Sequence, residues 1–449
     1  MHSQTRPRRR LATITAGIAV SLGLMVSQAL PASAATVWTP LVASDAAAQS
    51  RLGDAIAVST DGSTTIVGSK TRYTGATPTS ANQRPGAAYI YSGIPAVNGV
   101  TRTEDAILVA DDGLYETLSD QFGYSVALSA DGNIAAVGAP GYQTGSGGAV
   151  YMFERSGGVW TKTAKILSPS ATNFGYSVSL SDNGSTLLVG APGYIPSSTS
   201  TSAAYFFTRD ASAAWTYKTS VSTGLGGVQL GASVALSGNG ATAVVGVPKY
   251  YTTVSGIKKT QPRAQTYTFN GTAAAAQYVY TDPSTDTSSD FGVSVDLSST
   301  GAAVLIGAPG VDSTTSGTTT TYRPGAGYLY TGGAATPVMM TATVGSSAYT
   351  GARLGASVAI SPDGLSVVLG APRSTGANEN GGGGIARLWK NTTGTWPASS
   401  TTVSPGGLSG DQYGTSVSVA NNGRVAIGAP GKTVSGMSSA GTGYVIDIT

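Results

Sequence analysis

Few residues in this sequence are of the types that usually carry catalysis. The chain has 449 residues, no cysteine and a single histidine, His2. The lack of both residue types beyond that position excludes Ser-His-Asp and Cys-His catalysis there. It also excludes zinc sites built from imidazole or thiolate ligands. Acid–base chemistry is left to carboxylates, lysines and tyrosines, so we expect a protein that is not an enzyme and carries no cofactor.

Carboxylates gather in two short segments. The first contains Asp105, Asp111, Asp112, Glu116 and Asp120, and the second contains Asp282, Asp286 and Asp290. Two carboxylates held about 5–10 Å apart across a cleft could hydrolyse a glycosidic bond, and either group could bind a cation or a sugar. The alternative, which we favour, is that they are solvated loop residues of a weakly charged protein. The ligand-binding candidates among them are Asp111, Asp112, Glu116, Asp286 and Asp290.

Tyrosines and one basic cluster are the remaining candidates. Exposed tyrosines suit contact with carbohydrate or protein because their rings are apolar and their hydroxyls polar. However, Tyr142, Tyr194 and Tyr250 follow the same repeated motif, which favours packing. The pair Lys258-Lys259 lies in a long segment between motifs, where a solvated loop is the alternative. The candidates for ligand contact are Tyr73, Tyr250, Tyr322, Lys258 and Lys259.

These candidates lie between copies of one repeated motif. Each copy opens with a large apolar residue and a glycine, such as Phe122-Gly123, and reaches a second glycine, here Gly138, after 15 residues in six copies and 14 in the last. The seven openings are Leu52-Gly53, Phe122-Gly123, Phe174-Gly175, Leu230-Gly231, Phe291-Gly292, Leu354-Gly355 and Tyr413-Gly414. A constant interval among variable surroundings indicates a repeated structural unit.

Each unit predicts a four-stranded antiparallel sheet. Residues 125–128 alternate small and apolar side chains, as a strand does, and Asp131-Gly132 supplies the turn because glycine adopts positive φ without a steric penalty. The return strand is more uniformly apolar, which fits burial on both faces, and Pro140 ends it. A third strand with alternating aromatic residues over 148–153 and a fourth that begins near Trp160 complete the unit.

Seven such sheets in series predict an all-β fold, the seven-bladed β-propeller. The blades begin near residues 52, 122, 174, 230, 291, 354 and 413, within a single domain over 35–449. Residues 37–43 predict a fourth strand with no hairpin before it, whereas 441–449 predict a third strand with no fourth after it. We therefore expect the N-terminal strand to complete the last blade, which protects two sheet edges and closes the ring.

The aromatic-glycine opening and the later Gly-Ala-Pro of the copies resemble the FG-GAP repeat of the integrin α-subunit propeller and of related bacterial secreted proteins. The resemblance covers nearly all of the chain after residue 34 and implies the propeller fold. Many members of this family hold calcium in an Asp-x-Asp-x-Asp-Gly loop between the first two strands. Here that loop is a turn such as residues 129–132, with one acidic residue at most. Because calcium takes about six to eight oxygen ligands, we do not expect a calcium site.

Residues 1–34 predict a secretion signal that is removed. Four arginines up to Arg10 precede an apolar run over 11–30, and Ala32-Ser33-Ala34 offers a cleavage site. The run is also long enough for a retained membrane anchor, but its hydroxyl and amide residues favour removal. Loss of the four arginines turns the formal net charge of +3 slightly negative, so no general attraction to nucleic acid or to membranes is expected. We expect an extracellular, bacterial monomer.

Alternate loops of a propeller blade emerge on the same face of the ring. Turns such as Asp131-Gly132 share one face, called here the turn face, and the loops between second and third strands share the opposite one, the loop face. The loop face carries long segments that we expect to be irregular, namely 70–85, 193–201, 249–262, 310–324, 373–383 and 431–440. Because recognition usually lies in variable loops on a rigid scaffold, we expect a secreted, non-catalytic adhesion-type protein that binds an extracellular protein or carbohydrate through the loop face. The alternatives are a carboxylate-dependent polysaccharide hydrolase or lyase and a structural cell-surface component.

Overall fold

The computed structural model describes residues 36–72, 85–95, 97–110, 120–142, 147–169, 173–193, 202–225, 228–254, 257–284, 289–310, 314–316, 319–321, 325–333, 335–341, 352–373, 383–405 and 408–448. These residues form strands and turns, and no α-helix occurs among them. No helix with the length and apolarity to cross a membrane is therefore found in these ranges. The predicted signal segment, residues 1–34, lies outside the described residues.

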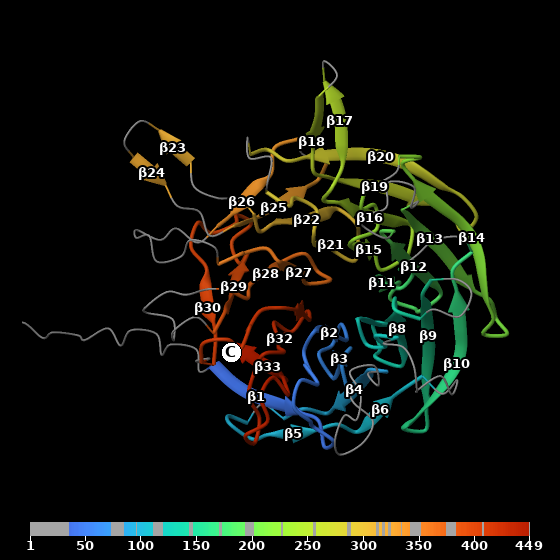
Figure 1. Cartoon of the computed structure of the whole chain (residues 1–449), viewed down its shortest axis with the longest axis vertical. Helices are drawn as coiled ribbons and strands as arrows, with labels where there is room; N and C mark the ends of the chain where they lie inside the picture. The colour runs from blue at the N-terminus through green and yellow to red at the C-terminus, as the bar shows by residue number, and fades with distance from the viewer. Residues whose placement is uncertain are drawn as a thin grey trace, which may run out of the picture. The chain divides into compact units, whose positions relative to one another are not determined.

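Seven antiparallel sheets surround a central axis and form the predicted propeller (Figure 1). Blade 1 contains β2 (Ala55–Val58), β3 (Thr64–Ser69), β4 (Ala87–Ser92) and β6 (Ala106–Leu108). Blade 2 contains β7 (Ser125–Leu128), β8 (Ile134–Ala139), β9 (Ala149–Ser156) and β10 (Val159–Leu167). Blade 3 contains β11 (Ser177–Leu180), β12 (Thr186–Ala191), β13 (Ala203–Arg209) and β14 (Trp215–Ser222).

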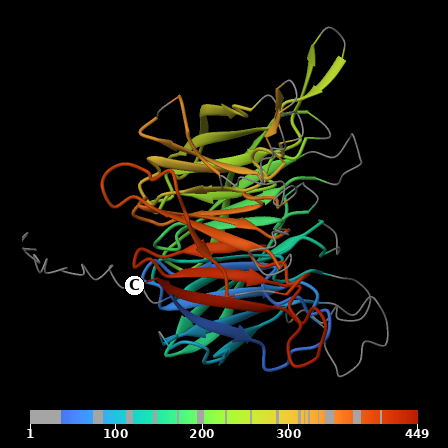
Figure 2. The same cartoon turned by 90° about the vertical axis from the view of Figure 1, so that its left-hand side faces the viewer.

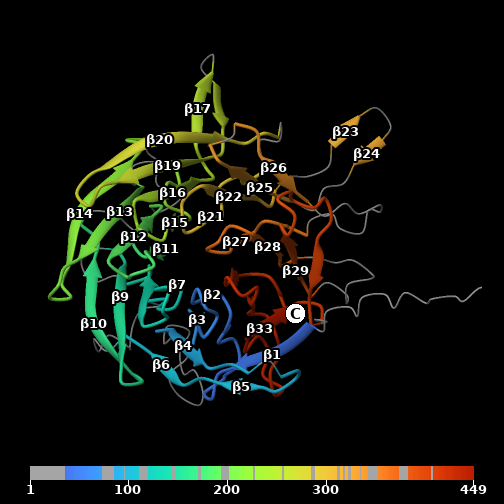
Figure 3. The ribbon, with the colours of Figure 1, turned by 180° about the vertical axis from the view of Figure 1, so that it is seen from behind.

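The other four blades follow in chain order. Blade 4 contains β15 (Val234–Leu236), β16 (Thr242–Val247), β19 (Arg263–Phe269) and β20 (Ala274–Thr281), and blade 5 contains β21 (Val295–Leu297), β22 (Ala303–Ala308), β25 (Ala326–Thr331) and β26 (Val338–Met340). Blade 6 contains β27 (Ser357–Ile360), β28 (Ser366–Ala371), β29 (Ile385–Lys390) and β30 (Thr401–Val403). Blade 7 contains β31 (Val417–Val419), β32 (Val425–Ala429), β33 (Thr442–Ile448) and β1 (Thr36–Val42). The first strand of each blade contacts the first strands of its neighbours, β31 and β2 included, so the first strands encircle the axis (Figure 3).

The N-terminal strand closes the ring, as the sequence predicts. β1 pairs antiparallel with β33 from Thr36 opposite Ile448 to Leu41 opposite Gly443. The Thr442 hydroxyl also donates a hydrogen bond of 2.7 Å to the Leu41 carbonyl. Strands β1 and β33 therefore lie side by side in one sheet, and each covers an edge of the other that would otherwise have unpaired backbone groups.

The last sheet has five strands rather than the expected four. A short strand from blade 1, β5 (Arg102–Thr103), pairs parallel with the outer edge of β1. Next to it, the Gly99 amide donates to the Trp38 carbonyl at 2.8 Å, and Glu104 accepts the Ser44 amide at 2.9 Å. Strand β5 is too short to give a periodic pattern, so the sequence does not predict this additional contact of blade 1 with the N-terminal strand.

The two glycines of the motif meet where neighbouring blades touch. A Cβ on the second glycine of each copy would lie less than 3.0 Å from the carbonyl oxygen of the first glycine in the next blade. The seven pairs are Gly68 with Gly123, Gly138 with Gly175, Gly190 with Gly231, Gly246 with Gly292, Gly307 with Gly355, Gly370 with Gly414 and Gly428 with Gly53. The constant spacing of the motif therefore reflects a close backbone approach between adjacent blades, which only glycine permits.

A ring of serine hydroxyls crosses the same interfaces. The serine two residues after the first glycine donates a hydrogen bond of 2.8–2.9 Å to the first-glycine carbonyl of the next blade. The six donors are Ser125, Ser177, Ser233, Ser294, Ser357 and Ser416. The sequence places all six at one position near the axis, and Ala55 takes that position in blade 1.

Adding the missing hydroxyl is expected to stabilise the ring. In the variant Ala55→Ser, the new hydroxyl can donate to the Gly123 carbonyl as Ser125 donates to Gly175 at 2.8 Å, and such a bond contributes about 1 kcal/mol. Denaturant titration should show a higher free energy of unfolding for Ala55→Ser and a lower one for the reciprocal variant Ser177→Ala. A shift of both variants in the same direction would contradict a stabilising role for the serine ring.

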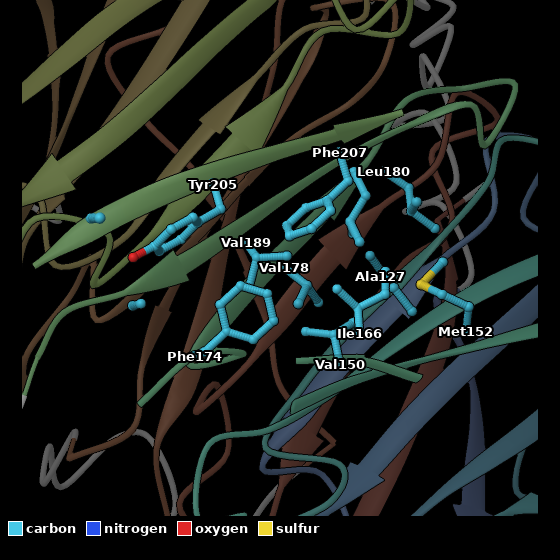
Figure 4. Close-up of a cluster of buried hydrophobic side chains, with 14 residues drawn as sticks. Ala127, Val150, Met152, Ile166, Phe174, Val178, Leu180, Val189, Tyr205 and Phe207 are labelled. Atoms are coloured by element: carbon cyan, nitrogen blue, oxygen red, sulfur yellow. The ribbon is translucent and has the colours of Figure 1, made fainter. Parts of the chain in front are cut away.

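The hydrophobic core lies between neighbouring blades. The cluster between blades 2 and 3 joins Val150 and Met152 of β9 to Val178 and Tyr205 of blade 3 (Figure 4). Phe174, the opening residue of the third copy, is fully buried between them, with its ring centroid 5.6 Å from that of Tyr205. The alternating aromatic residues of the third strands β9 and β13, such as Phe153 and Phe207, are thus part of the inter-blade core.

Two loop-face segments that we expected to be irregular form hairpins instead. Segment 249–262 contains β17 (Tyr251–Val254) paired with β18 (Ile257–Thr260), and segment 310–324 contains β23 (Thr314–Ser316) paired with β24 (Thr319–Thr321). Threonine, valine and isoleucine dominate these stretches, and β-branched residues favour strands. The β17–β18 hairpin projects beyond the sheets in the edge-on view (Figure 2).

Candidate functional site

A ring of polar residues lies where the chain enters each blade on the loop face. The residue before each opening is polar in all seven copies, and we call this set the polar collar. It consists of Arg51, Gln121, Asn173, Gln229, Asp290, Arg353 and Gln412. All except Gln229 have a positive φ, between 53° and 63°. A left-handed backbone costs a residue with a Cβ about 1–2 kcal/mol, yet every copy has a hydrogen-bonding side chain here and none has glycine.

Part of the collar borders a cleft between blades 3, 4 and 5. The cleft has a volume of about 450 Å³, and its lining includes Asn173, Gln229 and Asp290 of the collar together with Tyr176 and Lys249. All five side chains are half-buried. The volume is within the range of about 300–1,000 Å³ that is usual for ligand pockets.

The cleft residues differ in how fully their hydrogen-bonding groups are used. The Asn173 amide nitrogen donates to the Gly193 carbonyl at 3.0 Å, which leaves the amide oxygen for another partner. No hydrogen bond of the Gln229 side chain occurs within the described part of the chain. The Asn173 amide oxygen and the Gln229 amide are therefore available to a ligand, and each residue lies two positions before a motif glycine at a blade interface.

An ion pair forms one wall of the cleft. The Lys249 ammonium lies 2.6 Å from one Asp290 carboxylate oxygen, and the Arg353 guanidinium lies 3.4 Å from the other. These pairs are partly exposed, so their contribution to stability is small. Their main effect is to fix the carboxylate in place, and the three paired side chains together carry one net positive charge.

The collar continues away from the cleft through blades 7, 1 and 2. Arg51 lies 2.9 Å from Asp54 and 3.3 Å from the Gln412 amide oxygen.

Next to the cleft, the ring of Tyr176 packs against that of Tyr124, with centroids 4.7 Å apart. Burial, together with Tyr176, raises the pKa of Tyr124 well above its ordinary value, so this hydroxyl stays protonated at physiological pH.

The structure places four of the residues predicted from the sequence. Asp290 lies in the cleft. Tyr250 is half-buried, and the Arg263 guanidinium lies 3.4 Å from its ring centroid, which indicates packing. Lys259 is exposed on β18, and Lys258 belongs to the same strand.

The other six predicted residues, Tyr73, Tyr322, Asp111, Asp112, Glu116 and Asp286, lie outside the described residues. Sequence reasoning missed Asn173, Gln229, Lys249 and Tyr176 as a group. A usable signal existed for the first two, because every copy has a polar residue immediately before its opening.

A second cavity lies on the axis at the turn face. It has a volume of about 150 Å³ and is lined by residues from all seven blades, including Asp182, Asp296 and Ser299. Backbone hydrogen bonds link neighbouring turns around it, for example from the Asp182 amide to the Gly238 carbonyl at 2.7 Å. The Ser299 hydroxyl donates to Asp182 at 2.6 Å.

The Asp296 carboxylate points into this cavity and joins two blades. One of its oxygens accepts the amide of Ile360 in the next blade at 2.8 Å, and the other accepts the Leu297 amide at 2.9 Å. Burial raises the pKa of Asp296 to about 7, although the two amide donors oppose this shift. The carboxyl group is thus divided between its neutral and ionised forms near neutral pH.

The turns that replace the calcium loops of the family satisfy their own polar groups. Asp131 accepts hydrogen bonds from the Ser129 hydroxyl at 2.6 Å and the Asn133 amide at 3.0 Å. Partial burial opposes these bonds, but together they lower the pKa of Asp131 below its ordinary value. Within the described ranges, no group of three or more Asp, Glu, His or Cys residues is placed to hold a metal ion.

Comparison with known proteins gives one family match. The FG-GAP repeat family matches residues 103–153, which run from the outer strands of blade 1 through the third strand of blade 2 and include Phe122-Gly123 and Gly138-Ala139-Pro140. A comparison with curated proteins found no match. The motif within the matched segment makes the same glycine contacts as the other six copies in the ring. Residues 103–153 are therefore similar to the FG-GAP repeat, and the seven-bladed β-propeller around them fits an FG-GAP repeat protein that resembles the integrin α-subunit propeller.

Proposed function

We propose that this chain is a secreted, non-catalytic binding protein that recognises an extracellular glycan or protein through its loop face. An FG-GAP propeller suggests a binding-type scaffold. The observation that carries the proposal is the loop-face cleft of about 450 Å³ with half-buried polar side chains on its walls. Residues 1–34, with their signal-like pattern, support export. The weak net charge favours a glycan or protein partner over nucleic acid.

The ion pair in the cleft provides a direct test. The double variant Lys249→Ala/Asp290→Ala keeps the net charge and removes side chains whose pairing contributes little to stability. We expect it to lower affinity for the ligand at least tenfold in a binding screen of the chain without residues 1–34 against immobilised cell-wall polysaccharides and surface proteins.

The matched control removes an equivalent ion pair elsewhere. Arg209 and Glu154 lie 2.5 Å apart near the turn-face ends of β13 and β9. The double variant Arg209→Ala/Glu154→Ala should therefore bind the ligand like the unmodified protein. Equal affinities for the two double variants would show that the cleft is not the binding site.

One observation favours a second candidate function, a carboxylate-dependent hydrolase. Asp182 and Asp296 line the same axial cavity, and a raised pKa such as that of Asp296 is typical of a general acid. The cavity volume of about 150 Å³, however, is below the usual size of a substrate pocket. Release of reducing ends from a polysaccharide by the protein, lost in Asp296→Asn, would favour the enzyme over the binding protein.

A further inference from the structure

We propose that the cleft between blades 3, 4 and 5 is a carbohydrate subsite, in which Asn173 and Gln229 hydrogen-bond the hydroxyls of a neutral sugar residue beside Tyr176. This inference rests on the proposed function, because it names the ligand class of the same loop-face site. It is argued from the unused hydrogen-bonding capacity of the cleft, its charge and its backbone geometry.

The hydrogen-bonding groups of the cleft match those of a sugar. Each sugar hydroxyl both donates and accepts, and a carboxamide side chain offers both functions in one plane. The Asn173 amide oxygen remains available after its nitrogen donates to Gly193. The Gln229 amide keeps both of its ends available within the described residues. Tyr176 adds an aromatic ring with a polar tip, the kind of side chain that contacts the mixed apolar and polar surface of a sugar.

The charge of the cleft favours a neutral ligand. Lys249 and Asp290 are the charged side chains in its lining, and they pair with each other at 2.6 Å. Arg353, outside the lining, adds a second positive charge 3.4 Å from Asp290, which disfavours a cationic ligand. A phosphate or carboxylate ligand would meet the Asp290 carboxylate, so a neutral ligand is favoured over both. A protein anchor is also less suitable, because such anchors are usually aromatic or arginine side chains in fully desolvated pockets, whereas five of the ten residues that line this cleft are polar and those five are only half-buried.

The backbone conformation of Asn173 permits a substitution that removes the side chain and tests its role in binding. Its φ is 59°, a conformation that glycine adopts without strain. Asn173→Gly loses the hydrogen bond from the amide nitrogen to the Gly193 carbonyl, worth about 1 kcal/mol, but it also removes the left-handed strain of about 1–2 kcal/mol, so the propeller should stay folded. Gln121 has the same position in blade 2 and a φ of 57°, but it does not line the cleft. Gln121→Gly is thus a matched control with the same backbone change.

The experiment titrates the protein without residues 1–34 with neutral pentasaccharides, namely cellopentaose, xylopentaose, mannopentaose and chitopentaose, by calorimetry. We expect at least one to bind with one-to-one stoichiometry. Affinity should fall at least tenfold in Asn173→Gly and in Gln229→Ala and should not change in Gln121→Gly, and the thermal midpoints of all three variants should stay close to that of the unmodified protein. If the midpoint of Asn173→Gly or of Gln229→Ala falls sharply, the other of the two variants is the test of the cleft.

The outcomes separate this inference from the function on which it rests. Binding to a surface protein that depends on Lys249 and Asp290, without binding to any pentasaccharide, would overturn the sugar subsite and leave the loop-face function standing. Pentasaccharide binding that survives both Asn173→Gly and Gln229→Ala would overturn the placement of the subsite in this cleft. Binding of neither class of ligand would count against both proposals.

Discussion

Gly190→Ala is expected to destabilise the propeller by about 3 kcal/mol or more, at the upper end of the usual range for overpacking. The new Cβ would lie less than 3.0 Å from the Gly231 carbonyl oxygen and from the Ser177 hydroxyl. Neither atom can move freely, because the carbonyl belongs to the backbone of the next blade and accepts the hydrogen bond of that same hydroxyl at 2.9 Å. Relief of the clash requires blades 3 and 4 to separate, which also loosens the core between them.

A glycine without close neighbours provides the control for this prediction. Gly157, in the tight turn between β9 and β10, has a φ of 57°, and a Cβ added to it would have no neighbouring atom within 4 Å. Gly157→Ala should therefore cost only the left-handed strain of about 1–2 kcal/mol. Denaturant titration of both variants measures the difference. Equal losses of unfolding free energy would mean that the glycine contacts between blades do not constrain the fold.

The close approach of the glycines explains why the sequence predicts this fold so well. No other residue fits in place of Gly190 or its six equivalents at the blade interface, so the interval between the motif glycines is kept while the surrounding loops vary. Ring closure was also predictable, because the sequence predicts a strand over residues 37–43 with no hairpin before it, and the structure has this strand as β1 (Thr36–Val42). In contrast, β5 (Arg102–Thr103) contains two residues, and its place beside β1 depends on the path of the whole preceding loop.

The candidate site was less predictable than the fold for a related reason. Asn173, Gln229 and Asp290 have equivalent positions in three blades, so the sequence could have shown that they share a ring. It could not show that a cleft opens beside these three rather than beside Gln121 or Gln412. That depends on the volumes of neighbouring side chains and on the course of the loops, which have no repeat pattern.

The second large effect concerns pH. Burial raises the pKa of Asp296 in the folded protein from an ordinary value of 3.8 to about 7, so the folded state binds a proton that the unfolded state has released. The stabilising contribution of this proton is complete below about pH 4 and is lost as the pH rises through about 7. The difference between the two pKa values corresponds to roughly 4 kcal/mol, an upper bound because the side chain retains some solvent contact through the cavity. The ionised form is disfavoured because the lining offers no cation, only a second carboxylate, Asp182.

The variant Asp296→Asn is expected to remove this pH dependence. An asparagine keeps an oxygen that can accept the Ile360 amide, bonded at 2.8 Å in the unmodified chain, and it stays neutral at every pH. Because unfolded Asp296 is already ionised at pH 5, removing its titration should stabilise the protein by roughly 1.6 kcal/mol at pH 5 and by roughly 4 kcal/mol at pH 8. The asparagine NH2 cannot accept the Leu297 amide, which costs about 1 kcal/mol at both pH values, so we expect a clear gain in stability at pH 8 and a small one at pH 5. Asp210→Asn serves as the control, because Asp210 is exposed and hydrogen bonds from Ser212 and Ala214 lower its pKa, so both forms should respond alike between these pH values. Thermal midpoints at pH 5 and pH 8 measure the effect. If the unmodified protein is equally stable at both pH values, Asp296 is ionised in the folded ring. Its charge would then be balanced by a group other than the residues that line the cavity.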